Sequence, residues 1–184
     1  MDSLLKTVLW RQFGGTIDML ENAVLACPGT LWQESLWIDH SDNPLQPEGT
    51  AFWYIIYHTL FWLDLYLTGS VEGFAPPEPF TLDELDPAGV LPERPYTKDE
   101  LHAYLMHTRE KCQTTIAELS DERAHQQLAF SWMGGNPMSF LELLLYNMRH
   151  VQEHAAQLNM FLGQHAVAEA SDWVPWAGAD KGEK

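Results

Sequence analysis

Apolar residues recur every three or four positions along most of this chain, which is the period of an amphipathic helix. The first such stretch runs from about Asp2 to Ala26, and Cys27-Pro28-Gly29 is expected to end it. Gly14 and Gly15 interrupt the pattern in its middle, so a bend is predicted there.

A second, very hydrophobic helix is predicted from about Thr50 to Leu67, with Thr50 as its N-cap and Thr68-Gly69-Ser70 after its end. The segment 70–96 that follows cannot be a regular helix, because proline removes a backbone donor and clashes with the preceding turn. It carries Pro76, Pro77, Pro79, Pro87, Pro92 and Pro95. A long connecting loop is therefore expected, and loops of this length usually have a function or a topological need.

Two further helices are predicted from their start signals. Thr97 and Glu100 have the spacing of a capping box, and the helix should run to about Leu119. Asn136-Pro137 is a typical helix start, predicting a last helix to about Leu162 that stops at Gly163. Four long helices with almost no strand signal predict an all-α protein, a four-helix bundle over residues 1–165, with a tail over 166–184.

Composition narrows the function classes. The 184 residues include 26 acidic and 10 basic side chains, a formal charge of −16 without a basic run. Such a surface repels phosphate, so neither nucleic-acid binding nor binding to an anionic membrane is expected. The apolar stretch Ala51–Leu67 contains polar residues and is too short to predict a membrane span. Two unpaired cysteines and an N-terminus without leader features predict a cytoplasmic protein.

The histidines carry the strongest chemical signal. His150 and His154 stand four residues apart on the apolar-faced last helix, so both imidazoles lie on one face and are expected to point inward or along a cleft. An HxxxH pair alone is weak support for a metal site, because eight histidines make such a pair common by chance. Its position on the helix face is the stronger observation.

His58 lies in the middle of the second helix among almost wholly apolar neighbours. A buried imidazole needs partners for its ring nitrogens. A metal ion shared with His150 and His154 is one such partner, and a backbone carbonyl or a tyrosine hydroxyl is another. Three imidazoles around one ion would leave a coordination position free, as in catalytic rather than structural metal sites.

The remaining candidate groups are weaker. The other histidines are expected to be solvated, and the carboxylate pairs are expected to be exposed charges. Four aromatic residues are expected to be core residues rather than the lining of a ligand pocket. These groups are His40, His102, His107, His125 and His165; Asp83-Glu84 and Asp121-Glu122; and Trp53, Tyr57, Trp62 and Trp132. Glu153, between the paired histidines, is expected to point away from them. No single catalytic residue can be assigned from the sequence.

The residues around these histidines resemble a known family. Trp53-Tyr54-Ile55-Ile56-Tyr57-His58-Thr59-Leu60 and His150-Val151-Gln152-Glu153-His154-Ala155-Ala156-Gln157 are similar to the corresponding helices of the DinB-like (DinB/YfiT-type) metalloproteins. In that family the HxxxH pair is often followed by Arg-Gly-Gln. Here Ala155-Ala156 replaces Arg-Gly, which puts any outer-shell or substrate role of that arginine in doubt, whereas Gln157 remains.

The resemblance implies that His58, His150 and His154 bind one divalent metal, usually zinc or nickel, with Gln157 as an outer-shell hydrogen-bond partner. It implies an up-down-down-up bundle, with segment 70–96 as the crossover between helices two and three. Characterised relatives include thiol-dependent transferases and an isomerase, in which the metal activates a low-molecular-weight thiol against an electrophile. A homodimer and a role in stress or detoxification are expected on the same ground.

Three functional hypotheses remain open at this point. The first is a metal-dependent thiol S-transferase acting on small electrophiles, or a hydrolase that uses the same ligands with water. The second is a non-catalytic metal-binding protein of a stress response or an interaction module. The third is a metal-free helical bundle that serves as an interaction module.

Overall fold

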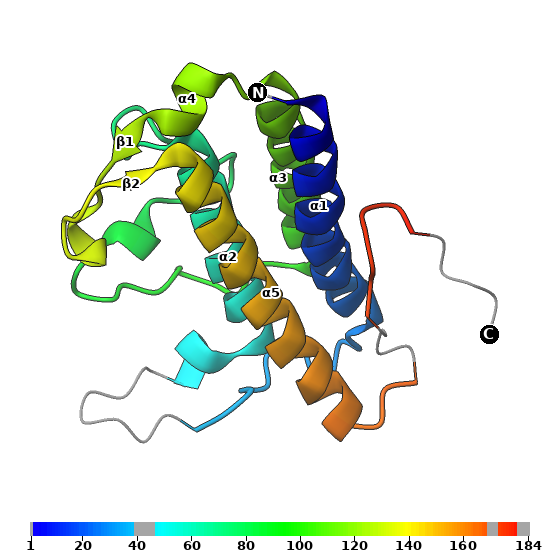
Figure 1. Cartoon of the computed structure of the whole chain (residues 1–184). Helices are drawn as coiled ribbons and strands as arrows, with labels where there is room; N and C mark the ends of the chain where they lie inside the picture. The colour runs from blue at the N-terminus through cyan, green and yellow to red at the C-terminus, as the bar shows by residue number, and fades with distance from the viewer. Residues whose placement is uncertain (1, 39–46, 169–172, 180–184) are drawn as a thin grey trace.

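The computed structural model describes residues 2–38, 47–168 and 173–179, and over these the protein is all-α apart from one small hairpin (Figure 1). The α-helices are α1 (Ser3–Ala26), α2 (Phe52–Thr68), α3 (Lys98–Glu118), α4 (Asp121–His125) and α5 (Phe140–Gln164). Strands β1 (Gln127–Leu128) and β2 (Met138–Ser139) form the hairpin, and 3₁₀ turns occur at Pro47–Thr50, Asp83–Leu85 and Ser131–Met133. None of the described helices is both long and apolar enough to cross a bilayer.

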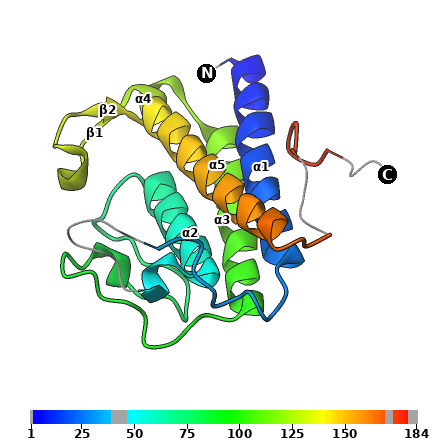
Figure 2. The same cartoon turned by 90° about the horizontal axis from the view of Figure 1, so that it is seen from below.

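Each of the four long helices packs against two others: α1 and α2 both lie against α3 and α5 (Figures 1 and 2). Helices α2 and α5 run antiparallel, since Phe52 at the start of α2 meets Phe161 near the end of α5, while Tyr66 meets Tyr146. Their apolar faces are fully buried in the common core. This pairing places the middle of α2 beside the middle of α5.

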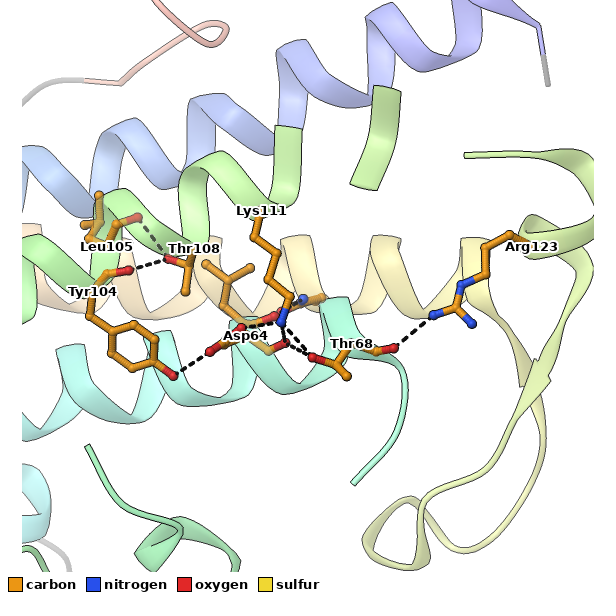
Figure 3. Close-up of polar contacts among 9 residues, drawn as sticks. Asp64, Thr68, Tyr104, Leu105, Thr108, Lys111 and Arg123 are labelled. Atoms are coloured by element: carbon orange, nitrogen blue, oxygen red, sulfur yellow. Dashed lines mark hydrogen bonds and ion pairs between the residues drawn. The ribbon is translucent and has the colours of Figure 1, made fainter. Parts of the chain in front are cut away.

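Helices α2 and α3 run in the same direction and are joined by a polar network inside the core (Figure 3). The Asp64 carboxylate is 1% exposed and accepts hydrogen bonds from the Tyr104 hydroxyl, at 3.0 Å, and from the Lys111 ammonium. Lys111 also donates to the Thr68 hydroxyl at 2.7 Å. A buried carboxylate is stable only when it is paired and hydrogen-bonded, so this network fixes α3 against α2.

Segment 70–96 crosses from the end of α2 to the start of α3 and, as predicted, contains no α-helix. Gly69, with a φ of 80°, ends α2 in the left-handed conformation, where the Arg123 guanidinium would lie only 2.7 Å from any added Cβ. That combination favours glycine on both conformational and steric grounds. The crossover then makes its 3₁₀ turn at Asp83–Leu85.

Capping boxes begin both α3 and α5, and the sequence analysis predicts the first of them. The capping box of Thr97 and Glu100 is confirmed, with the Thr97 side chain accepting from the Glu100 backbone N–H. The predicted start of the last helix at Asn136-Pro137 is wrong, because a second capping box, between Ser139 and Glu142, begins α5. Residues 134–137 instead lie in the turn that joins the strands, where Gly134 and Gly135 have positive φ angles.

Three other helix predictions also need correction. Thr50 belongs to the 3₁₀ turn before α2, and the N-cap is Ala51, which makes no side-chain cap hydrogen bond. Gly163 lies inside α5, which ends one residue later at Gln164. Gly14 and Gly15 do not interrupt α1, since the helix is continuous from Ser3 to Ala26.

The glycine pair in α1 is explained by the C-terminal segment 173–179, which lies across it. The Ala177 N–H donates to the Arg11 carbonyl at 2.8 Å, and the Gly178 N–H donates to the Asp18 carboxylate at 2.7 Å. A Cβ on Gly14 would lie 2.5 Å from the Cβ of Ala177. The missing side chains therefore permit the approach of the segment. The division at residues 165 and 166 stays a prediction, and 169–172 and 180–184 lie outside the described residues.

We expect Gly14→Ala to release segment 173–179, because the added methyl group occupies the space of Ala177. Gly163→Ala is the matched control, since nothing lies within 4 Å of a Cβ at that helical position. The control should raise the free energy of unfolding by up to about 1 kcal/mol through helix propensity alone. Chymotrypsin should cut after Trp176 faster in Gly14→Ala than in Gly163→Ala or the parent, as followed by mass spectrometry. Equal cutting rates in all three would contradict this packing.

Candidate functional site

The antiparallel packing of α2 and α5 brings the three predicted histidines into one cluster. His58 projects from the middle of α2 toward His150 and His154, which lie one turn apart on α5. The Nε2 atom of His150 is 3.3 Å from Nε2 of His58 and 3.1 Å from Nε2 of His154. All three ligand-type nitrogens lie within 4.8 Å of one another.

These separations match those expected around a small divalent cation. With metal–nitrogen bonds of about 2.0–2.1 Å and tetrahedral angles, two ligating nitrogens stand roughly 3.3–3.4 Å apart. The distances from His150 to its two neighbours are 3.3 and 3.1 Å, within a few tenths of an ångström of that value. In the part of the chain that the structure describes, no cysteine, carboxylate or other histidine joins the group.

Hydrogen bonds on the far side of two rings determine which nitrogens face the centre. His58 Nδ1 lies 2.7 Å from Glu84 Oε2, and His154 Nδ1 lies 2.8 Å from Gln157 Oε1. Both partners are acceptors, so each Nδ1 carries the proton and each Nε2 presents a lone pair to the centre. A single N–H on His150 Nε2 can satisfy only one of these lone pairs at a time. The donor set therefore fits a shared cation, and such outer hydrogen bonds typically accompany histidine ligands.

Glu84 is the residue that sequence reasoning missed. The expectation that the Asp83-Glu84 pair is solvated is wrong for Glu84, whose side chain is only 5% exposed. The 3₁₀ turn of the crossover carries it onto α2, where its Oε2 accepts from His58 and, at 2.8 Å, from the Trp62 indole N–H. The sequence around it offers no signal of this contact, because no local spacing connects a loop residue to a helix that ends 16 residues earlier.

Burial keeps the imidazoles of His150 and His154 in the neutral form that metal ligands require. Burial, followed by the effects of His154 and His58, lowers the pKa of His150 to about 3. Burial also lowers the pKa of His154, followed by the effect of His58. Burial alone would raise the pKa of the Glu84 carboxyl, but its hydrogen bonds, above all the one to His58, bring it below the usual range. At neutral pH His150 and His154 are therefore uncharged, beside the Glu84 carboxylate.

A cavity of about 850 Å³ opens onto all three imidazoles. Its walls come from α2, α5, the crossover and the hairpin loop, which contributes Trp132. Of the four aromatic residues considered from sequence, Trp62 and Trp132 line this cavity, whereas Trp53 and Tyr57 are core residues at 3% and 0% exposure. The space adjoining the imidazoles is large enough for a small organic molecule.

The other described histidines lie apart from the cluster. His102 pairs with Glu21 on α1 at 2.9 Å, and His107 is exposed. His125 and His165 each hydrogen-bond a backbone carbonyl one turn earlier in the chain. His40 lies outside the described residues. The structure thus brings together the three histidines chosen from the sequence and none of these four.

Comparison with known proteins gives one match. The model of the DinB superfamily matches residues 10–158, a span that includes His58, His150, His154 and Gln157. No curated protein and no solved structure matches the chain. The match therefore supports the family and leaves substrate and activity to be argued from the site.

His154→Ala should remove most bound metal, because it deletes one of three nitrogen donors, whereas His102→Ala should retain it. Both changes remove one imidazole, so they differ only in position. The measurement is elemental analysis of protein purified without a His-tag and reloaded with zinc or nickel. Equal metal loss in the two variants would mean that the wrong histidines were chosen.

Glu84→Gln should weaken metal affinity by roughly 10- to 100-fold while preserving the fold, because the amide keeps an acceptor for His58 but loses the negative charge. Glu93→Gln is the matched control, since it removes one exposed charge from the same crossover. Competition with a chromogenic chelator gives the dissociation constants. An unchanged constant for Glu84→Gln would rule out an electrostatic role for this carboxylate at the site.

Proposed function

This chain belongs to the DinB superfamily, and we propose that it is a metal-dependent enzyme that activates a low-molecular-weight thiol for transfer to a small electrophile. The metal ligands would be His58, His150 and His154. The observation that carries the proposal is the convergence of three imidazole nitrogens at the wall of a cavity. A closed structural site would instead use a fourth protein ligand.

The chain's own groups prepare the site in three ways. Glu84 fixes the ring of His58, and its charge makes that imidazole a stronger donor. Gln157 orients His154 through its side-chain carbonyl. The aromatic walls of the cavity limit the water around the reactants. A divalent metal bound there would lower the pKa of a coordinated thiol, or of water, and so supply a nucleophile at neutral pH.

Three imidazoles suit zinc or nickel, and we propose one of these as the native metal. Hydrolysis by activated water would use the same ligands and is a variant of this function. A non-catalytic metal-binding protein in a stress response is the alternative, and the open cavity beside the imidazoles favours the enzyme over it. Both hypotheses share the metal site and differ in whether an exogenous ligand enters.

We also propose the order of the helices, the cellular compartment and the oligomeric state. Antiparallel α2 and α5, together with the parallel contacts of α2 and α3, support an up-down-down-up four-helix bundle with segment 70–96 as its crossover. Free, buried Cys27 and Cys112 are in keeping with a cytoplasmic protein. Exposed apolar side chains at the start of α1, including Leu4 and Val8, are in keeping with a homodimer.

The test is incubation of metal-loaded protein with 2-mercaptoethanol and 4-nitrobenzyl chloride. Transfer forms the carbon–sulfur bond, releases chloride and gives the thiol proton to solvent. We expect thiol loss and chloride release in equal amounts, abolished in His150→Ala and retained in His102→Ala. Chloride release without thiol loss would favour hydrolysis. Absence of both from protein that retains its metal would contradict the enzyme and favour the non-catalytic alternative.

A further inference from the structure

The metal-facing cavity has an inner end and a mouth of different character. The inner end holds the three imidazoles, with Trp62 and Glu84 beside them. Several side chains that line the cavity remain exposed to solvent, among them Asp86, Trp132 and Tyr146, and we call these three the mouth. A molecule bound beside the imidazoles therefore has two exposed aromatic rings and a carboxylate among the walls of its cavity.

The rings at the mouth are held in position. The Trp132 indole N–H donates to the Tyr66 hydroxyl at 3.1 Å, although the side chain is 44% exposed. Its ring meets that of Trp62 at 5.2 Å between centroids and an interplanar angle of 68°, so the two indoles form a corner. Preorganised indole faces of this kind attract cations as well as apolar groups.

The charges along the cavity all have one sign. Glu84 and Asp86 are carboxylates, and among the described residues no lysine or arginine lines the cavity. Of the arginines on the elements around it, Arg123 donates to the Thr68 carbonyl and lies over the Phe140 ring at 4.0 Å. Arg149 lines a neighbouring depression, which shares Tyr146 and His150 with this cavity. Within the cavity itself, a substrate carboxylate or phosphate would therefore meet carboxylates and no lysine or arginine.

A metal at the three imidazoles does not reverse this preference at the mouth. Its two positive charges would be offset in part by the adjacent Glu84, whereas Asp86 and Trp132 lie with the exposed residues of the mouth. The chain as a whole carries a formal charge of −16, which favours the approach of cations and opposes that of anions. The charge of the cavity mouth and the net charge of the chain therefore both favour a cationic ligand over an anionic one.

We propose that the second reactant of this site is an organic cation, of the alkylammonium class, whose charged group is held at the mouth by Trp132, Tyr146 and Asp86. This inference rests on the proposed function, because it assigns a charge to the electrophile of the proposed transfer. The apolar part of such a molecule would extend along Trp62 toward the imidazoles. Anionic electrophiles of the same size would be excluded.

The test compares three probes of similar size that differ in charge: choline, with a trimethylammonium group, and 3,3-dimethylbutan-1-ol and 3,3-dimethylbutanoate, with a tert-butyl group in its place. Dissociation constants are measured by ligand-observed NMR titration of the full chain, with and without zinc. We expect choline to bind about tenfold more tightly than the neutral alcohol, and the anion to bind more weakly than either. Equal binding of choline and the alcohol, or tighter binding of the anion, would overturn the proposal.

Variants locate the effect. Trp132→Leu keeps an apolar side chain but removes the indole face, and should bring the preference for choline down to about twofold. Asp86→Asn should lower choline affinity without changing that of the alcohol. Trp37→Leu, which alters a surface indole outside the cavity, should leave all three constants unchanged. A choline preference that survives both Trp132→Leu and Asp86→Asn would place cation binding elsewhere and contradict the proposal.

The outcomes separate this inference from the proposed function. Metal content and thiol consumption test the function, whereas the three probe constants test substrate charge and need no turnover. Protein that consumes thiol but binds the three probes equally well would retain the function and lose the charge assignment. Protein that prefers choline at the mouth yet holds no metal would lose the proposed function alone.

Discussion

The structure depends on the packing of two apolar helices that carry imidazoles at their contact. Helices α2 and α5 bury most of their facing apolar side chains, with Phe52 against Phe161 at one end, and Tyr66 meets the exposed Tyr146 at the other. This register sets His58 beside both His150 and His154, with its ring centroid 5.2 Å from each of theirs. Burying ring nitrogens without a partner costs free energy. A divalent cation bound between the three imidazoles would provide that partner.

Segments outside this helix pair complete the site. The crossover 70–96 supplies Glu84 to the outer face of His58, and the hairpin of β1 and β2 holds Trp132 over the cavity. Neither segment contributes one of the three imidazoles, so each can vary without altering the donor set. The division is physically reasonable, because rigid helices hold ligand geometry while loops form the cavity through which small molecules enter.

Local signals explain what the sequence predicted correctly. The capping box at Thr97 and the spacing of His150 and His154 involve residues within four positions of one another, so they are independent of tertiary structure. The predicted start of α5 at Asn136-Pro137 is wrong, because the helix begins three residues later at a capping box of Ser139 and Glu142. The pairing of His58 with the other two was suggested by its apolar surroundings and by the resemblance.

Non-local contacts account for the misses. Glu84 reaches His58 only because the crossover folds back over α2, and no local pattern encodes that path. Gly14 resembles a helix breaker until segment 173–179 is seen to lie against it. In both cases the reason for the residue lies more than twenty positions away along the chain. From a single sequence, a residue of this kind can be given only the behaviour that is usual for its type. A loop glutamate such as Glu84 is then expected to be solvated, and a helical glycine such as Gly14 is expected to bend its helix.

X-ray absorption of the zinc-loaded protein tests the central claim most directly. The account predicts about three imidazole nitrogens at roughly 2.0–2.1 Å and one further light ligand, which a sulfur at about 2.3 Å replaces when a small thiol is added. A coordination sphere closed by a fourth protein group, or one without imidazole scattering, would contradict it.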